Sequence, residues 1–484
     1  MEYEKLSITE LHELLVKKVI TPLDLVKKAL ELAKNDKNND FEYIIEDRAI
    51  ELAKNLGEPE VDNLLWGIPF IIKDNLSTKD IPTTGSSNIL NGYVPVFDAT
   101  CVKKLYEKKA IPIAKSTLDE LAMGGTGTSG HKGTTYNPYD KDHKHLVGGS
   151  SCGSAAATAS AITPFALGSD TGDSIRKPAS YAGLVGFKPT WSRISRYGLF
   201  PFAPSLDTVG VFARNVKDIA IVTDAMSGHD LNDSTSTYRE LDDLTKGLEE
   251  KNGSFKVAVL KPVVNAIHDK SILEAFNKTI ENLKNDGITV DFIDFSEELL
   301  ETLFPTYFVI SCAEATSNNA NLDGIKFGPF YKGNTYEEVM SNARTKGFSE
   351  LIKRRFIFGS FALMKENQND LFVRAQKNRR RIVNEINKLL EKYDFIYLPA
   401  TPTVAPKIGE SSDKLSNEYL IADNHMVIAN FAGLPSLTLP IGMKDGLPFG
   451  GNITGRAFED LNVLKLGQMI ENHTGLKGIY VKGE

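Results

Sequence analysis

Cysteine is scarce in this 484-residue chain, and long apolar runs are absent. The three cysteines, Cys101, Cys152 and Cys312, form no C-x-x-C pair, which argues against a disulfide framework or a zinc site. No run of about 18 consecutive apolar residues is present, and the N-terminus lacks the basic-then-apolar order of a secretion signal. We therefore expect a soluble, cytoplasmic protein with reduced thiols and no contact with a membrane.

Basic residues are fewer than acidic ones: the chain has 56 Lys and Arg against 63 Asp and Glu, and its formal net charge is −7. That sign is wrong for a protein that binds by neutralising phosphates, so we expect any nucleic-acid contact to be local or through a partner. The eight histidines have no metal-ligand spacing such as H-E-x-x-H, and a G-x-x-x-x-G-K-[ST] loop is missing. The sequence thus argues against a metal hydrolase and a P-loop NTPase.

The order of predicted elements indicates one large α/β domain over residues 1–484, with a central mixed β-sheet surrounded by helices. Helices are expected over about residues 7–35 and 372–392, and buried strands within 65–75, 255–260 and 394–399. The polar stretch of about residues 227–254 is either a surface excursion or a subdomain boundary, and we favour the excursion. The basic run in the later helix is more typical of a solvated face than of a nucleic-acid site, and it comprises Lys377, Arg379, Arg380 and Arg381.

Chemistry is suggested by two Gly/Ser-rich loops and one lysine. Residues 123–154 are rich in Gly, Ser and Thr, and a second such segment covers residues 168–178. Either loop alone would be read as a simple turn. Lys73, however, ends the buried strand, and a buried lysine can lose its proton and serve as a base for a serine nucleophile.

The two loops resemble the signature of the amidase signature family. Residues 148–154 read G-G-S-S-C-G-S and residues 170–178 read D-T-G-D-S-I-R-K-P, against the family pattern G-G-S-S-G-G-S-A-A and D-T-G-G-S-I-R-x-P. The resemblance continues through residues 67–75, 183–190, 205–210 and 432–435, and so covers nearly the whole chain. It implies amide hydrolysis by a Ser-cisSer-Lys triad.

In this resemblance Ser174 matches the nucleophile, Ser150 the bridging serine after a cis peptide bond, and Lys73 the base. A hydroxyl both donates and accepts, so Ser150 can pass a proton from Ser174 to Lys73. The backbone amides that match the oxyanion hole are those of Thr171, Gly172, Asp173 and Ser174. Asp170 and Arg176 are expected to pair and fix that turn.

Two residues depart from the family pattern. Cys152 stands where Gly or Ser is usual; it could be proposed as a nucleophile, but no basic partner is evident and we interpret it as a packing residue. Asp173 replaces the second Gly of T-G-G-S, and a carboxylate there opposes the negative charge of an oxyanion unless it is turned away. We still expect activity, since backbone amides form the hole.

Within the family, residues 119–124, 185–199 and 353–355 are similar to the glutamine-hydrolysing A subunits of tRNA-dependent amidotransferases. This resemblance implies that Arg355 holds the α-carboxylate of glutamine and that Asp423 takes its α-ammonium. Gly124 and Ser129 also match substrate-binding positions. A free amino acid requires such opposite charges, and the planar fork of arginine suits a carboxylate.

The same resemblance implies a three-subunit enzyme with a B and a C subunit that converts Glu-tRNA(Gln) to Gln-tRNA(Gln). The ammonia would be made here, whereas ATP and magnesium would bind the B subunit, which would also hold most of the tRNA. No cofactor or metal is therefore expected in this chain. Two alternatives are a free-standing amidase, against which Arg355 and Asp423 argue, and a catalytically silent scaffold subunit, which only Asp173 favours.

Overall fold

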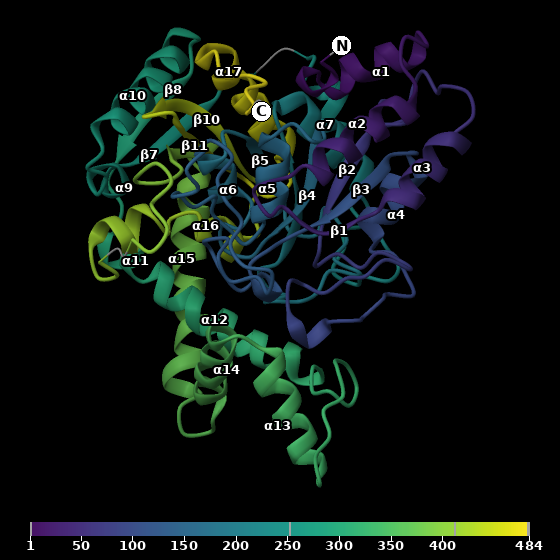
Figure 1. Ribbon diagram of the computed structural model, residues 1–484. Helices are drawn as coiled ribbons and strands as arrows, with labels where there is room; N and C mark the ends of the chain where they lie inside the picture. The colour runs from purple at the N-terminus through teal and green to yellow at the C-terminus, as the bar shows by residue number, and fades with distance from the viewer. Residues whose placement is uncertain (1, 251–252, 411–412, 482–484) are drawn as a thin grey trace.

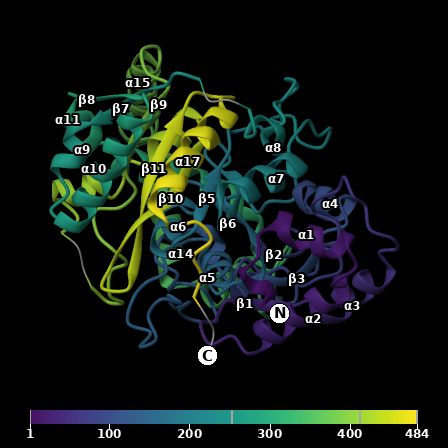
Figure 2. The same ribbon diagram turned by 90° about the horizontal axis from the view of Figure 1, so that it is seen from above.

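The computed structural model describes residues 2–250, 253–410 and 413–481, whose strands form one 11-stranded sheet (Figures 1 and 2). In order across the sheet they are β1 (Phe41–Ile44), β3 (Ile111–Ser116), β2 (Pro69–Lys73), β4 (Phe165–Asp170), β6 (Thr208–Ala213), β5 (Val185–Lys188), β10 (Ser436–Lys444), β11 (Leu447–Gly455), β9 (Phe395–Pro399), β7 (Lys256–Leu260) and β8 (Thr289–Ile293). Pairing is parallel in β3–β2–β4 and β9–β7–β8 and antiparallel elsewhere. The predicted α/β class with a central mixed sheet is confirmed.

The strands predicted from apolar runs are present as β2, β7 and β9. Every residue of β2, β3 and β4 is buried, as expected for parallel strands that are covered on both faces. Because β2 and β4 run parallel and side by side, their carboxyl ends meet at one edge of the sheet. Lys73 and Asp170 are the last residues of these two strands.

Helices cover both faces of the sheet. In chain order they are α1 (Ile8–Val16), α2 (Pro22–Lys34), α3 (Glu46–Asn55), α4 (Thr100–Glu107), α5 (Cys152–Ala159), α6 (Arg176–Tyr181), α7 (Val216–Met226), α8 (Leu244–Gly247), α9 (Lys261–Asn265), α10 (Lys270–Asn285), α11 (Glu297–Glu301), α12 (Leu303–Asn318), α13 (Tyr336–Gly347), α14 (Glu350–Leu363), α15 (Arg374–Leu390), α16 (Val427–Ala432) and α17 (Asp460–Thr474). Capping boxes start α1 at Ser7 and α2 at Thr21. In the described part of the chain, no helix is long and apolar enough to cross a membrane.

The two faces of β10 are covered by different helices. A Cβ on Gly467 of α17 would lie 2.3 Å from the side chain of Leu437, whereas a Cβ on Gly450 of β11 would meet Thr438 and Ser180 of α6. Leu437 and Thr438 are neighbours in β10 and therefore point to opposite faces. Helix α6, which follows the second Gly/Ser loop, thus packs on the face opposite α17 (Figure 2).

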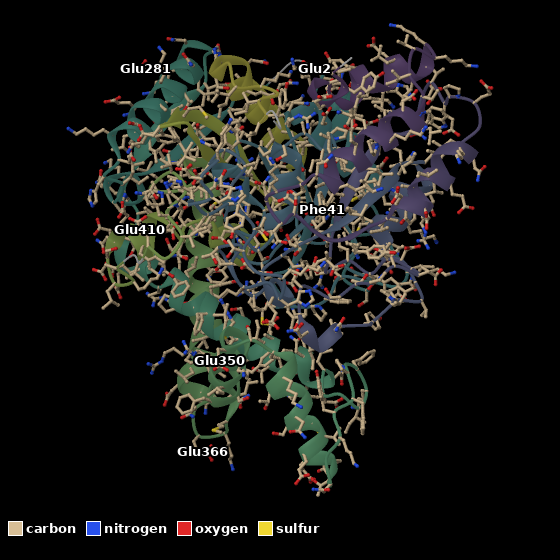
Figure 3. The ribbon with its side chains drawn as sticks, in the orientation of Figure 1. Glu2, Phe41, Glu281, Glu350, Glu366 and Glu410 are labelled. Carbon is tan, nitrogen blue, oxygen red and sulfur yellow. The ribbon has the colours of Figure 1, made fainter. Side chains whose placement is uncertain are left out.

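Helices α12 to α15 build an arm that projects below the sheet (Figure 1). Helix α12 packs against α14 and α15 within the arm, and α12 and α15 both contact α16, which joins the arm to the body. Glu350, at the start of α14, and Glu366, beyond its end, both lie on this arm (Figure 3). Arg355 therefore comes from the arm, whereas the Gly/Ser loops belong to the body.

The surface excursion expected over about residues 227–254 stays a prediction. Within it α8 packs against α7 and α17, while residues 251 and 252 lie outside the described residues. In the basic run three side chains are exposed, but Arg379 donates from Nε to the Phe431 carbonyl (3.1 Å) and from Nη1 to Ser205 Oγ (2.9 Å). The expected solvated face is wrong for Arg379, because α15 packs against α16 there.

Candidate active site

Lys73 lies in a buried ring of hydroxyl groups at the edge where β2 and β4 end. Its Nζ is 2.8 Å from Ser150 Oγ and 2.9 Å from both Ser151 Oγ and Ser169 Oγ. The side chain is fully buried, and burial lowers the pKa of Lys73 to about 7. A substantial fraction of this amine is therefore neutral near neutral pH, which a base requires.

Of the three serines around Lys73, Ser151 and Ser169 make further hydrogen bonds to other groups, which leaves Ser150 as the candidate proton donor to Lys73. Ser151 Oγ donates to the Ser169 carbonyl at 3.1 Å, and Ser169 Oγ accepts a further hydrogen bond from Asn75 at 2.9 Å. A neutral lysine amine has two N–H groups and one lone pair, so it can accept one proton from a neighbouring hydroxyl. Ser150 is well placed to supply that proton. The peptide bond between Gly149 and Ser150 is cis.

Ser174 lies beside this ring and is 4% exposed. The Ser151 N–H donates to the Ser174 carbonyl at 3.2 Å, which holds the two Gly/Ser loops together. Among the hydrogen bonds of the described residues, none joins the Ser174 and Ser150 hydroxyls. Catalytic hydrogen bonds often tighten only when substrate is bound, so this arrangement still fits a nucleophile.

The turn before Ser174 presents free backbone donors. No hydrogen bond within the described residues uses the N–H groups of Gly172, Asp173 or Ser174. A Cβ on Gly172 would lie 3.1 Å from the ring of Tyr307, so the turn closely approaches α12. Unpaired amides on a tight turn can bind a developing oxyanion.

A buried ion pair fixes this turn. Arg176 donates to the two oxygens of Asp170 at 2.9 and 3.1 Å and to the Gly172 carbonyl at 2.7 Å. Asp170 also accepts from the Ile175 N–H at 2.9 Å and from Asn430 at 3.0 Å. Burial alone would raise the pKa of Asp170, but the Arg176 guanidinium outweighs it and holds that pKa below its usual value.

Asp119 organises the first glycine-rich loop, a role that sequence reasoning missed. Its carboxylate accepts from the N–H and the hydroxyl of Ser129 at 3.1 and 2.8 Å, and from the N–H groups of residues 126–128. A Cβ on Gly124 would lie 2.5 Å from the Asp119 side chain, and the Asp119 N–H donates to the Ser150 carbonyl at 3.1 Å. Gly124 and Ser129 are thus connected to the ring around Lys73.

Arg355 offers an unsatisfied cation. Its Nε and Nη1 are buried and have no hydrogen-bond partner among the described residues. The guanidinium lies over the rings of Phe308 at 5.4 Å and Phe202 at 5.8 Å. The Phe202 N–H donates to Asp207, which also accepts from the Thr171 hydroxyl at 2.6 Å, so these contacts tie Arg355 to the oxyanion turn.

Asp423, in contrast, is already paired. Lys177 lies 3.2 Å from a carboxylate oxygen of Asp423 and 2.8 Å from one of Asp173. The carboxylate of Asp173, which replaces a glycine of the family pattern, is therefore paired with the ammonium group of Lys177. No sequence motif indicated Lys177, since the family pattern leaves its position open.

Cys152 is buried at the start of α5, and burial raises the pKa of its thiol to about 12. A thiol with that pKa is a poor nucleophile near neutral pH. All three cysteines are unpaired and buried. These surroundings fit the interpretation of Cys152 as a packing residue.

Comparison with known proteins bears on this geometry. Residues 24–464 match the family model described as Amidase. The chain is 41% identical over 479 residues to the A subunit of the glutamyl-tRNA(Gln) amidotransferase from Thermoanaerobacter pseudethanolicus, with 97% of both chains covered. It is 38% identical to the same subunit from Persephonella marina, covering 99% and 98%. The crystal structure of the Thermotoga maritima counterpart superposes with a TM-score of 0.82 at 34% identity, covering 99% and 98%.

Proposed function

Since this chain belongs to the amidase signature family, we propose that it is the glutamine-hydrolysing A subunit of a glutamyl-tRNA(Gln) amidotransferase. The observation that carries the proposal is the buried Lys73, 2.8 Å from Ser150 and beside a turn of free amides that ends at Ser174. The names of the relatives support the substrate.

The first chemical step forms an ester. Neutral Lys73 takes the proton of Ser150 as Ser150 takes that of Ser174, and the Ser174 oxygen attacks the side-chain amide carbon of glutamine. The backbone amides of residues 171–174 stabilise the oxyanion. Collapse breaks the carbon–nitrogen bond, and the leaving nitrogen takes a proton back from Lys73 through Ser150. Ammonia and a glutamyl ester of Ser174 result.

The second step is hydrolysis of that ester. Water gives its proton to Lys73 through Ser150 and attacks the ester carbon, with the same amides stabilising the oxyanion. Glutamate leaves, and the proton returns to Ser174.

Arg355 and Asp423 would hold the two charged ends of glutamine. The unpartnered Nε and Nη1 of Arg355 match the α-carboxylate, for which a guanidinium is the best side-chain partner. Asp423 would accept the α-ammonium. Gly124 and Ser129, held by Asp119, would close the other side of the site.

We further propose that the ammonia is used on a partner B subunit, in a three-subunit enzyme that also contains a C subunit. The B subunit would bind ATP and magnesium and make most of the tRNA contacts. The unpaired cysteines fit a cytoplasmic location.

The test is a glutaminase assay on the purified chain with and without co-expressed B and C subunits. We expect glutamate release that requires Ser174 and amidation of Glu-tRNA(Gln) only in the assembled enzyme. Hydrolysis of other small amides in preference to glutamine would indicate the free-standing amidase. Assembly without any hydrolysis would indicate the silent scaffold.

A further inference from the structure

Lys177 connects the two carboxylates that flank the substrate end of the site. Its Nζ lies 2.8 Å from Asp173 Oδ2, 3.2 Å from Asp423 Oδ1 and 3.1 Å from the Asp423 carbonyl. Lys177 is in the first turn of α6, and its N–H donates to the Asp173 carbonyl at 2.9 Å. Asp423 comes from the segment before α16, 246 residues later in the chain.

The lysine in this cluster is charged. Burial disfavours an ammonium group, but Asp173 and Asp423 outweigh it and hold the pKa of Lys177 well above its usual value. The two carboxylates and this ammonium leave a net charge of −1, which is the charge that a lone aspartate would have. The other titratable side chains that interact with the cluster are Asp170, Tyr181, Tyr307, Lys414, Tyr419 and His425.

The two ends of the proposed glutamine site are therefore unequal. Arg355 has buried donors without a partner among the described residues, whereas Asp423 already binds an ammonium group supplied by the chain. A substrate ammonium that binds Asp423 shares this carboxylate with Lys177, which lies at its Oδ1. Repulsion between the two cations favours a shift of Lys177 toward its other carboxylate, Asp173.

We propose that Lys177 is an internal competitor for the substrate ammonium at Asp423, and that Asp173 is the acceptor that holds Lys177 when the substrate displaces it. This inference rests on the proposed function. Lys177 and Asp173 are then specificity-determining residues, since they set how strongly the site prefers an amide that carries an α-ammonium.

The competition has a measurable consequence for substrate choice. Glutaramate is glutamine without the α-amino group, and it keeps both the reacting amide and the carboxylate that Arg355 would bind. Lys177 offsets part of the advantage of the α-ammonium, because the ammonium must displace it from Asp423. The ratio of kcat/KM for glutamine to kcat/KM for glutaramate reports this advantage directly.

The experiment measures that ratio in the chain purified with its partner subunits. Lys177→Met should raise the ratio about tenfold, because Asp423 is freed for the substrate. Asp173→Asn should lower it several-fold, because Lys177 then has Asp423 as its remaining carboxylate. The double variant should keep the high ratio of Lys177→Met, since the carboxylate of Asp173 affects this ratio only through Lys177.

Lys465→Met is the matched control, because Lys465 is also a buried lysine near a carboxylate, Glu250 at 3.9 Å, but lies in α17. Its ratio should equal that of the unaltered chain. A purely structural role for Lys177 would lower kcat/KM for both amides equally. A ratio in Lys177→Met within twofold of that of the unaltered chain would therefore overturn the inference. Shifts of the ratio in the same direction in Lys177→Met and Asp173→Asn would overturn it too. If the unaltered enzyme hydrolyses neither amide, the proposed function fails and this inference fails with it.

Discussion

In the proposed mechanism the amine of Lys73 and the hydroxyl of Ser174 lie at the two ends of one proton path. Ser174→Ala should abolish glutamine hydrolysis and leave folding intact, because removing one hydroxyl creates no large cavity. The measurement is glutamate release together with the thermal midpoint of unfolding. Retention of more than a few per cent of the activity would remove Ser174 from the role of nucleophile.

The lowered pKa of Lys73 predicts the pH dependence. The base must be neutral, and its pKa is about 7, so kcat/KM should rise with pH and reach half its maximum near pH 7. Lys188→Met is a matched control, because burial also lowers the pKa of Lys188 to about 7 but its Nζ donates to the Pro189 carbonyl at the end of β5. The control should keep the profile, whereas Lys73→Met should lose activity at every pH. A flat profile near neutral pH would argue against a lysine base.

Arg355→Lys tests the carboxylate end of the site. Lysine keeps the charge but loses the planar fork, so the KM for glutamine should rise about tenfold to a hundredfold, from about 1.5 to 3 kcal/mol of charged hydrogen bonding. The kcat should change little, because Arg355 contacts no reacting atom in the proposed mechanism. Steady-state kinetics over a range of glutamine concentrations separates the two. An unchanged KM with a lowered kcat would mean that Arg355 does not bind the carboxylate of glutamine.

At the scale of elements, helix α5 determines where the first serine loop lies. Gly153 is in its first turn, and a Cβ there would lie 2.3 Å from the Asp40 carbonyl and 2.5 Å from Thr117 Oγ1. Only glycine lets α5 contact the segment after β3 so closely.

Gly153→Ala should therefore lower the free energy of unfolding by about 1 to 3 kcal/mol and also reduce glutaminase activity, because Ser150 and Ser151 move with the start of α5. Gly253→Ala is the control, since the nearest atom to its Cβ would be 3.8 Å away. Urea titration and the glutaminase assay measure the two effects. Equal stability of both variants would contradict the close packing of α5.

At the scale of the whole molecule, the site joins the body of the sheet to the arm of α12 to α15. The serine loops and Lys73 come from the body, and Arg355 and Tyr307 come from the arm (Figure 1). In the proposed mechanism the arm therefore supplies the group that holds the carboxylate of glutamine, whereas the body carries out the chemistry.

An assembled enzyme with Ser174→Ala should still amidate Glu-tRNA(Gln) when an ammonium salt is supplied, and should fail with glutamine. Free ammonia bypasses the glutaminase site, and the substitution removes only one buried hydroxyl from the body of the molecule. The measurement is Gln-tRNA(Gln) formed with each donor, with the unaltered complex as control. Loss of the ammonia reaction would mean that Ser174 supports the assembly itself.

Local features of this protein follow from its sequence. Capping boxes at Ser7 and Thr21 start helices because they satisfy amides within one turn, and the apolar run before Lys73 forms a buried strand. The two Gly/Ser loops indicate the family because their residues are adjacent in the chain. These features depend on near neighbours, so sequence reasoning can reach them.

The surroundings of each functional group were decided by tertiary structure. Ser169 reaches Lys73 because β2 and β4 are adjacent in the sheet, and the strand order is not written in either segment. Lys177 pairs with Asp423 across 246 residues, and the orphaned donors of Arg355 depend on how α14 packs against α12. The sequence alone determined the fold class and the candidate triad; the pairing of Lys177 with Asp423 arises only from packing, because it joins distant segments.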